Sequence, residues 1–285
     1  MKLRRLLRKI PFVGSHFAPP VVPVVKLYGV IGGISPLRRG LSISSLDRDL
    51  ERAFAMNSAG CVALSVNSPG GSPVQSALLH QRIRDLAVEH KVEVIAVAED
   101  VAASGGYWLA LSADEIFADP SSIIGSIGVI SAGFGFTKAI ERLGVDRRVY
   151  TAGENKSTLD PFRPENPDDV SRLAEIQTEI HESFKGIVRA RRGERIAAAN
   201  EKEIFSGAFW TGRKALELGI IDGIGDLRSV LRDRFGPKVK LKCFGEQRPR
   251  LFRYFRSTAP TTPSDWFDGA LGTLEVRALW QRFGL

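Results

Sequence analysis

The stretch Asp100-Val-Ala-Ala-Ser104-Gly105-Gly106-Tyr-Trp108 lies at the centre of the segment that decides the fold, residues 92–129. Ahead of it, the apolar run at 92–98 predicts a short buried strand, and the residues from Tyr107 onward resume at helical spacing. A serine, Ser104, therefore comes where a strand turns into a helix. The free N–H groups of a helix N-terminus favour negative charge, so this position suits an acylating nucleophile. The alternative is that Ser104 only caps the helix, beside glycines that only permit a tight turn.

Strands and helices alternate on both sides of this stretch. We predict strands at residues 24–31, 61–66, 92–98, 115–118, 123–130 and 147–150, and helices at 45–54, 72–89, 104–111, 137–143 and 166–192. Such alternation indicates repeated right-handed βαβ units, a mainly parallel sheet and therefore an α/β fold with a helical C-terminal part. Ligands then bind at the carboxyl ends of the strands. We expect this domain at 24–235, after a basic segment and linker at 1–23 and before a basic, aromatic appendage at 236–285.

The composition allows a large core and excludes several kinds of site. The chain has 285 residues, of which 44% are hydrophobic, so it can bury one large domain. Its two cysteines are too few for a disulfide framework, and neither lies in a CxxC pair or at ligand spacing from a histidine. We therefore expect no metal and no cofactor.

The net charge of +8 is largely carried by the two ends of the chain. Basic side chains interleaved with leucine or phenylalanine favour peripheral contact with an anionic membrane surface. Nucleic acid is a less favoured partner, and solvated tails are the third option. No apolar run approaches the roughly 20 residues of a spanning helix, and residues 10–14 are too short for a secretory signal. We expect a cytoplasmic protein, either free or peripheral to the cytoplasmic membrane.

Hydrolysis of an amide through an acyl-enzyme needs a base besides the nucleophile and the oxyanion donors. No histidine lies between His90 and His181, so the usual base is missing after Ser104. Lys156 stands instead at the end of the strand predicted at 147–150. A buried lysine loses its charge more readily than an exposed one and can then act as a general base. The alternative is an exposed loop lysine.

Several ordered motifs over residues 24–225 resemble the signal peptide peptidase A family, the S49 serine peptidases. They are Asn67-Ser-Pro-Gly-Gly71, Ala103-Ser-Gly-Gly-Tyr-Trp108, Gly125-Ser-Ile-Gly-Val129, Gly153-Glu-Asn-Lys156, and Trp210-Thr-Gly212 with Asp222-Gly223. The resemblance implies a Clp/crotonase-type fold and a Ser-Lys dyad, in which Ser104 is the nucleophile and Lys156 the base. It further implies that Ser126 orients the lysine amine and that the backbone N–H groups of Gly71 and Gly105 form the oxyanion hole.

The chain is similar to the short, single-copy members of that family, which assemble into rings. The resemblance therefore implies a homo-oligomer whose neighbouring subunits complete each site. The predicted function is a serine endopeptidase for extended, mainly apolar peptides such as cleaved signal peptides. One alternative is a crotonase-like acyl-CoA enzyme that uses the oxyanion hole without a serine nucleophile. The other is a non-catalytic, membrane-associated scaffold, which an exposed and charged Lys156 would favour.

Overall fold

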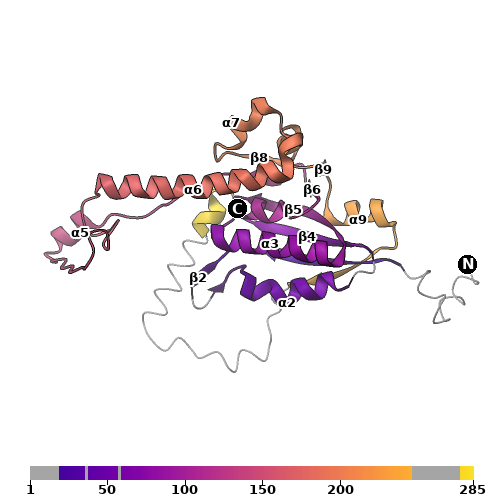
Figure 1. Cartoon of the computed structure of the whole chain (residues 1–285), viewed down its shortest axis with the longest axis horizontal. Helices are drawn as coiled ribbons and strands as arrows, with labels where there is room; N and C mark the ends of the chain where they lie inside the picture. Colours follow the sequence, from indigo (N-terminus) through magenta and orange to yellow (C-terminus); the bar gives the residue numbers. More distant parts are fainter. Residues whose placement is uncertain (1–18, 36–37, 57–58, 246–276) are drawn as a thin grey trace, which may run out of the picture.

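A computed structural model describes residues 19–35, 38–56, 59–245 and 277–285 of the chain. Its centre is an eight-stranded sheet with helices on both faces (Figure 1). The strands of this sheet are β1 Val21–Tyr28, β4 Cys61–Ser68, β5 Glu93–Ala103, β6 Glu115–Ala118, β7 Ile123–Gly125, β8 Phe209–Thr211, β9 Gly223–Ile224 and β10 Lys240–Phe244. A separate antiparallel pair is formed by β2 Gly33–Ser35 and β3 Arg38–Arg39.

The sheet is parallel apart from one strand pair. Its order is β10-β1-β4-β5-β6-β9, with parallel pairing throughout, while β7 pairs parallel with β5 and antiparallel with β8. The predicted α/β fold with a mainly parallel sheet is therefore confirmed. Strand β10 joins the sheet beyond residue 235, where the sequence analysis places the end of the domain. The central strand β5 is long enough to pair with β6 through residues 95–98 and with β7 through residues 101–103.

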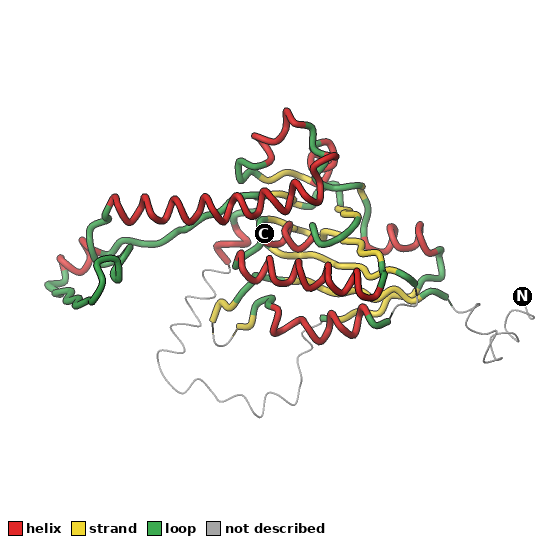
Figure 2. The backbone as a smooth tube through the Cα atoms, in the orientation of Figure 1, coloured by secondary structure: helices red, strands yellow, loops and turns green. Residues whose placement is uncertain are grey.

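Helices pack on both faces of the sheet because successive apolar side chains of a strand point to opposite faces. The helices are α2 Ile43–Phe54, α3 Pro73–His90, α4 Gly105–Ala110, α5 Thr137–Arg142, α6 Pro167–Arg192, α7 Glu201–Ile204, α8 Gly212–Glu217 and α9 Leu227–Phe235, with 3-10 turns η2 Gly193–Arg195 and η3 Ala198–Asn200. In β1, Val25 and Leu27 join the larger core with α2, α3 and α4, whereas Val22 and Val24 face α9. Figure 2 shows the resulting layers.

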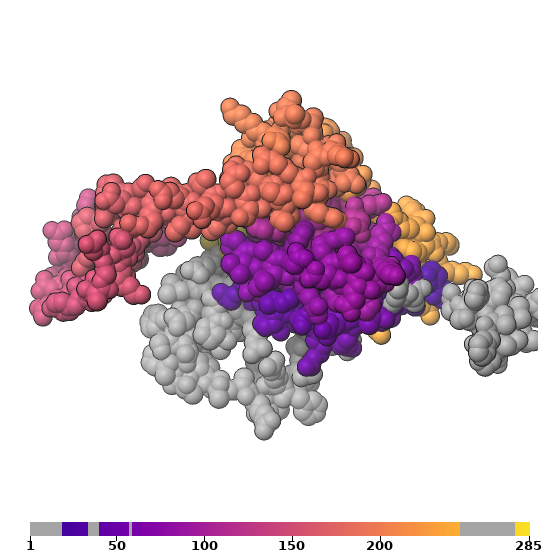
Figure 3. All heavy atoms as spheres, viewed as in Figure 1, coloured from indigo at the N-terminus to yellow at the C-terminus, as the bar shows by residue number. Residues whose placement is uncertain are grey.

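Residues 130–180 leave the body of the protein as a projecting arm (Figures 1 and 3). The arm consists of α5, the loops around it and the first half of α6, and none of its residues is buried. Its long helix begins as predicted, because the side chain of Asn166 accepts a hydrogen bond from the N–H of Asp168 at 3.1 Å. Helix α5 is also confirmed.

Two strand predictions around the arm are wrong. Residues 147–150 form no strand and are largely exposed, because the arm places no second strand beside them to pair with. The strand predicted at 123–130 ends at Gly125, where the chain turns away from β5. Among the described helices, none is both long and apolar enough to cross a membrane. The basic ends assigned to a membrane surface, at 2–9 and 248–256, lie outside the described residues.

Candidate active site

Ser104 is the residue between β5 and α4, and its backbone adopts an unusual conformation. Its φ is 53° and its ψ is −125°, a combination that costs a residue with a side chain about 1–3 kcal/mol. Backbone bonds hold it there: its N–H donates to the carbonyl of Gly125 at 2.8 Å, and its own carbonyl accepts from the N–H of Trp108 at 3.0 Å. The hydroxyl makes no capping hydrogen bond to α4. Ser104 thus occupies the N-cap position of α4 without capping the helix through its side chain.

The glycine turn after β4 packs directly against this serine. Gly70 has a φ of 102°, and a Cβ there would lie 2.8 Å from both the Ser104 Cβ and the Gly105 nitrogen. Hydrogen bonds of the residues on either side hold Gly71 in place. The carbonyl of Gly70 accepts from the N–H of Ile31, and the N–H of Ser72 donates to the carbonyl of Ile31, both at 2.8 Å. Within the described ranges, the N–H groups of Gly71 and Gly105 donate no hydrogen bond. Two adjacent free donors therefore lie beside the serine.

Ser126 follows β7 and also has a positive φ, 53°. Its N–H donates to the carbonyl of Ala208 at 2.7 Å, and only 7% of its surface is exposed. The preceding Gly125 allows close packing, because a Cβ there would lie 2.7 Å from the ring of Trp210. Strand β8, which carries that tryptophan, thus holds β7 and its serine beside the end of β5.

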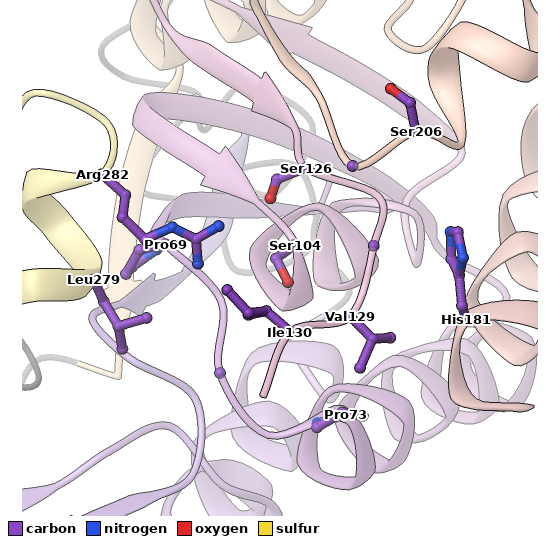
Figure 4. A pocket seen from close by; sticks show the side chains of 13 residues that line it. Pro69, Pro73, Ser104, Ser126, Val129, Ile130, His181, Ser206, Leu279 and Arg282 are labelled. Carbon is purple, nitrogen blue, oxygen red and sulfur yellow. The ribbon is translucent and has the colours of Figure 1, made fainter. Parts of the chain in front are cut away.

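These parts line one pocket with a cavity volume of about 440 Å³. Ser104, Ser126 and Gly71 all contribute to its wall, and the two serine hydroxyls face it (Figure 4). Val129 and Ile130 add apolar surface. The structure thus brings together the nucleophile, the second serine and the oxyanion turn that the sequence predicts. This arrangement can hold an acyl group at a serine with its oxygen against backbone donors.

Sequence comparison decides the family. The family model described as Peptidase family S49 matches residues 87–235, just over half of the chain. The chain belongs to peptidase family S49. Its core strands β5, β6 and β7, the nucleophile turn and the whole arm lie within the matched residues.

The chain is also similar to individual proteins over part of their length. The chain is similar to Protease 4 of Haemophilus influenzae, with 28% identity over 79% of this chain and 36% of that protein. It is 52% identical to a Brucella abortus protein named Na(+)/H(+) antiporter NhaA, over 93% of this chain and 37% of that protein. The chain therefore spans little more than a third of these relatives. A solved structure, of a mutant of the 1510-N membrane-bound stomatin-specific protease, is similar at a TM-score of 0.45 and 18% identity, covering 79% of this chain and 98% of that one.

In this S49 chain the helix that follows Ser104, α4, is entirely buried. Tyr107 donates its hydroxyl hydrogen to the carbonyl of Ile220 at 2.7 Å, and burial raises the pKa of this phenol well above its usual range. Trp108 stacks on Phe184 of α6, with ring centroids 4.6 Å apart. His80 of α3 bonds the Trp108 carbonyl through Nδ1 at 3.2 Å, and burial lowers the pKa of this histidine to about 4. The histidine is therefore neutral and donates, which fixes the helix behind the serine.

Lys156 lies elsewhere in the S49 domain. It belongs to the arm, in the loop between α5 and α6, and its side chain is exposed. Its backbone N–H closes a turn with the carbonyl of Gly153 at 3.2 Å, and it does not line the pocket. Figure 1 shows that this loop region is at the outer end of the arm, away from the sheet. The expected buried lysine is thus not buried within one chain.

The pocket residues that escaped the sequence analysis include one histidine and two residues near the end of the chain. His181 of α6 lines the pocket and donates from Nε2 to the carbonyl of Ile127 at 3.1 Å, so this nitrogen is committed to backbone. Leu279 and Arg282, from the described segment 277–285, line the opposite side. His181 lies on a helix without a motif around it, and the other two are far along the chain from Ser104. No local pattern indicated any of them.

Proposed function

We propose that this chain is a serine endopeptidase that hydrolyses extended, mainly apolar peptides, such as cleaved signal peptides. The observation that carries the proposal is the Ser104 hydroxyl, which makes no capping bond at a strained turn and lies beside the free N–H groups of Gly71 and Gly105. Membership of a peptidase family supports the same reaction.

The reaction follows from this geometry. The Ser104 oxygen attacks the substrate carbonyl carbon while a base takes the hydroxyl proton. Negative charge then develops on the carbonyl oxygen, and the donors at Gly71 and Gly105 stabilise it. The C–N bond breaks as the base returns the proton to the amine that leaves. Water then attacks the acyl-serine through the same steps and releases the acid.

The substrate would bind as an added strand along residues 128–130. This segment lines the pocket, and in the part of the chain that the structure describes its backbone forms no hydrogen bond with other backbone groups. An extended peptide could therefore pair with it main chain to main chain. Val129, Ile130 and Leu279 favour apolar side chains on that peptide.

The base in this proposal is Lys156 of a second copy of the chain. Lys156 is exposed on the arm, whose apolar side chains include Phe134, Leu143 and Tyr150, exposed by 81%, 76% and 91%. Exposed apolar surface of this kind is typical of an interface. Docking of the arm onto a second copy would bury the lysine, which disfavours the ammonium and yields the neutral amine that a base requires. Ser126 of that copy would then orient the amine.

The proposal is tested with fluorogenic apolar peptides and three proteins: wild type, Ser104→Ala and Lys156→Ala. Wild type should cleave, and each variant should lose about 10³-fold or more of its kcat/KM. Lys138→Ala is the matched control, since Lys138 is another exposed lysine of the arm. Its activity should equal that of wild type.

Two results would contradict this function. Equal cleavage by wild type and Ser104→Ala would remove the serine from the mechanism and favour an acyl-CoA enzyme that uses only the oxyanion donors. A folded wild type that cleaves no peptide would favour the second candidate, a non-catalytic scaffold. That candidate is supported by the exposure of Lys156 in the single chain.

A further inference from the structure

The segment 277–285 returns to the sheet and forms one side of the pocket. Phe283 is 9% exposed and packs with Val101 and Ala103 of β5, the residues that lead into the nucleophile. Its ring also meets that of Phe209 in β8 edge to face, with centroids 5.1 Å apart. This apolar anchor places the neighbouring Arg282 in the pocket wall together with Ser104.

Arg282 differs in its surroundings from the other pocket residues. Its guanidinium points into the pocket on the side of Ser104 (Figure 4). Among the described residues, the others that line the cavity include no lysine, arginine, aspartate or glutamate, and His181 is the one further titratable group among them. Across the described ranges Arg282 forms no ion pair, and its side chain is held only over the ring of Phe283, 5.9 Å from the centroid. A guanidinium that has no carboxylate partner among the described residues thus lies beside the proposed nucleophile.

We propose that Arg282 is a specificity-determining residue that selects peptides carrying a carboxylate close to the scissile bond. This inference rests on the proposed peptidase function. A guanidinium binds a carboxylate through two parallel N–H···O bonds, a geometry that neutral side chains do not match. The carboxylate belongs either to an Asp or Glu side chain or to the free C-terminus of the peptide. Apolar residues on the rest of the substrate would still bind along Val129 and Ile130.

The test uses an apolar fluorogenic peptide varied one position at a time on both sides of the scissile bond. At each position a Glu peptide is compared with its Gln counterpart, and peptides with a free C-terminal acid are compared with their amides. The kcat/KM values are measured for wild type, Arg282→Gln and Arg282→Glu. Arg277→Gln is the matched control, since Arg277 is exposed on the same segment and does not line the pocket.

Wild type should cleave one member of the acidic series about 10-fold better than its neutral counterpart, because hydrogen bonds to charged groups are stronger than neutral ones. The position of that member identifies the source of the carboxylate. Arg282→Gln should lose the preference, with the KM for the acidic peptide rising to that for its neutral counterpart. Arg282→Glu should prefer Lys over Glu at that position, and Arg277→Gln should behave as wild type.

Other outcomes would overturn the inference. If wild type cleaves Glu and Gln peptides equally at every position, Arg282 selects no carboxylate, although the peptidase function stands. If Arg282→Gln speeds the cleavage of all peptides alike, the residue blocks the pocket instead of selecting substrate. Binding of labelled Glu and Gln peptides to Ser104→Ala gives a readout without turnover, and equal affinities there would also refute the role of Arg282. Absence of any cleavage by wild type would instead defeat the proposed function itself.

Discussion

The nucleophile helix and the end of the arm carry the two residues of the proposed dyad, yet they are built in opposite ways. All six residues of α4 are buried, whereas α5 has no buried residue. Ser104 is fixed by backbone bonds to Gly125 and Trp108, while Lys156 lies on an exposed turn. Within one chain, therefore, the proposed nucleophile is held firmly and the proposed base is not beside it. Under the proposed mechanism, this difference assigns the lysine of each site to the arm of another copy.

The prediction with the largest expected effect concerns a mixture of two variants that are each inactive alone. Ser104→Ala keeps a normal arm, and Lys156→Ala keeps a normal nucleophile. If the lysine acts across subunits, an equal mixture assembled by co-expression should recover about a quarter of the wild-type sites, because each site then draws its serine and its lysine independently. Each variant alone should be inactive. The measurement is the peptidase rate of co-purified oligomers that carry two different affinity tags.

The outcome separates two arrangements. Co-purified oligomers without any recovered activity would show that serine and lysine must come from one chain, which would require the arm to fold back onto its own pocket. A failure of the two tagged proteins to co-purify would refute the oligomer. As a control, oligomers that combine Ser104→Ala with Lys138→Ala should show activity, since the second subunit is fully functional.

The body of the protein could be predicted from the sequence because its signals are local. The helix predicted at 72–89 is observed at Pro73–His90, and the strand predicted at 61–66 is observed at Cys61–Ser68. In both, apolar periodicity and a flanking turn lie within one short window. The position of Ser104 at a strand-to-helix junction follows from the same kind of signal.

The remaining features depend on contacts between distant residues. The strand predicted at 147–150 has the right residue types but no partner strand, so its pattern is misleading. The docking of Phe283 beside β5 joins residues that are far apart in the sequence and leaves no periodic trace. The exposure of Lys156 could not be predicted either, because a sequence motif specifies residue types and does not show what surrounds them in the fold.

A second prediction concerns the root of the arm, where α6 meets the sheet. Arg192 is 2% exposed, donates from Nη1 to Asp222 at 2.6 Å, and reaches the carbonyl of Gly219 from Nε and Nη2. Its removal would leave the partly buried carboxylate of Asp222 with fewer partners. We expect Arg192→Ala to lower the free energy of unfolding by about 3 kcal/mol, at the lower end for a broken buried ion pair. Urea denaturation measures this change.

The lower end is expected because Asp222 keeps Arg195 Nε at 3.2 Å and the N–H of Ile116 at 2.8 Å. The matched control is Arg189→Ala, one turn earlier in α6. Arg189 pairs with Glu201 in a bridge whose side chains are 46% and 41% exposed, so its loss should cost less than about 1 kcal/mol. If both variants lose a similar free energy of unfolding, the Arg192–Asp222 pair stabilises the protein no more than the exposed Arg189–Glu201 pair does.

The smallest predicted effect is a change of stability with pH that arises from the buried histidine His80 behind α4. His80 bonds the carbonyl of Trp108 in α4, and burial lowers the pKa of this histidine from 6.5 to about 4, with Arg84 and Arg191 nearby adding to the shift. Between these two values the unfolded chain binds a proton that the folded chain does not, so stability falls as the pH falls. From pH 7.5 to pH 5 we expect a loss of about 2 kcal/mol from this group. Urea denaturation of wild type and His80→Gln at both pH values checks it.

Between pH 7.5 and pH 5, His80→Gln should lose about 2 kcal/mol less stability than wild type, because glutamine does not bind a proton in the unfolded chain. The surface carboxyls are the same in both proteins, so the difference between wild type and His80→Gln isolates the contribution of the histidine. An equal pH dependence in wild type and His80→Gln would mean that His80 is protonated in the folded protein. Moderate acid should therefore lower the stability of the protein through the buried histidine behind α4.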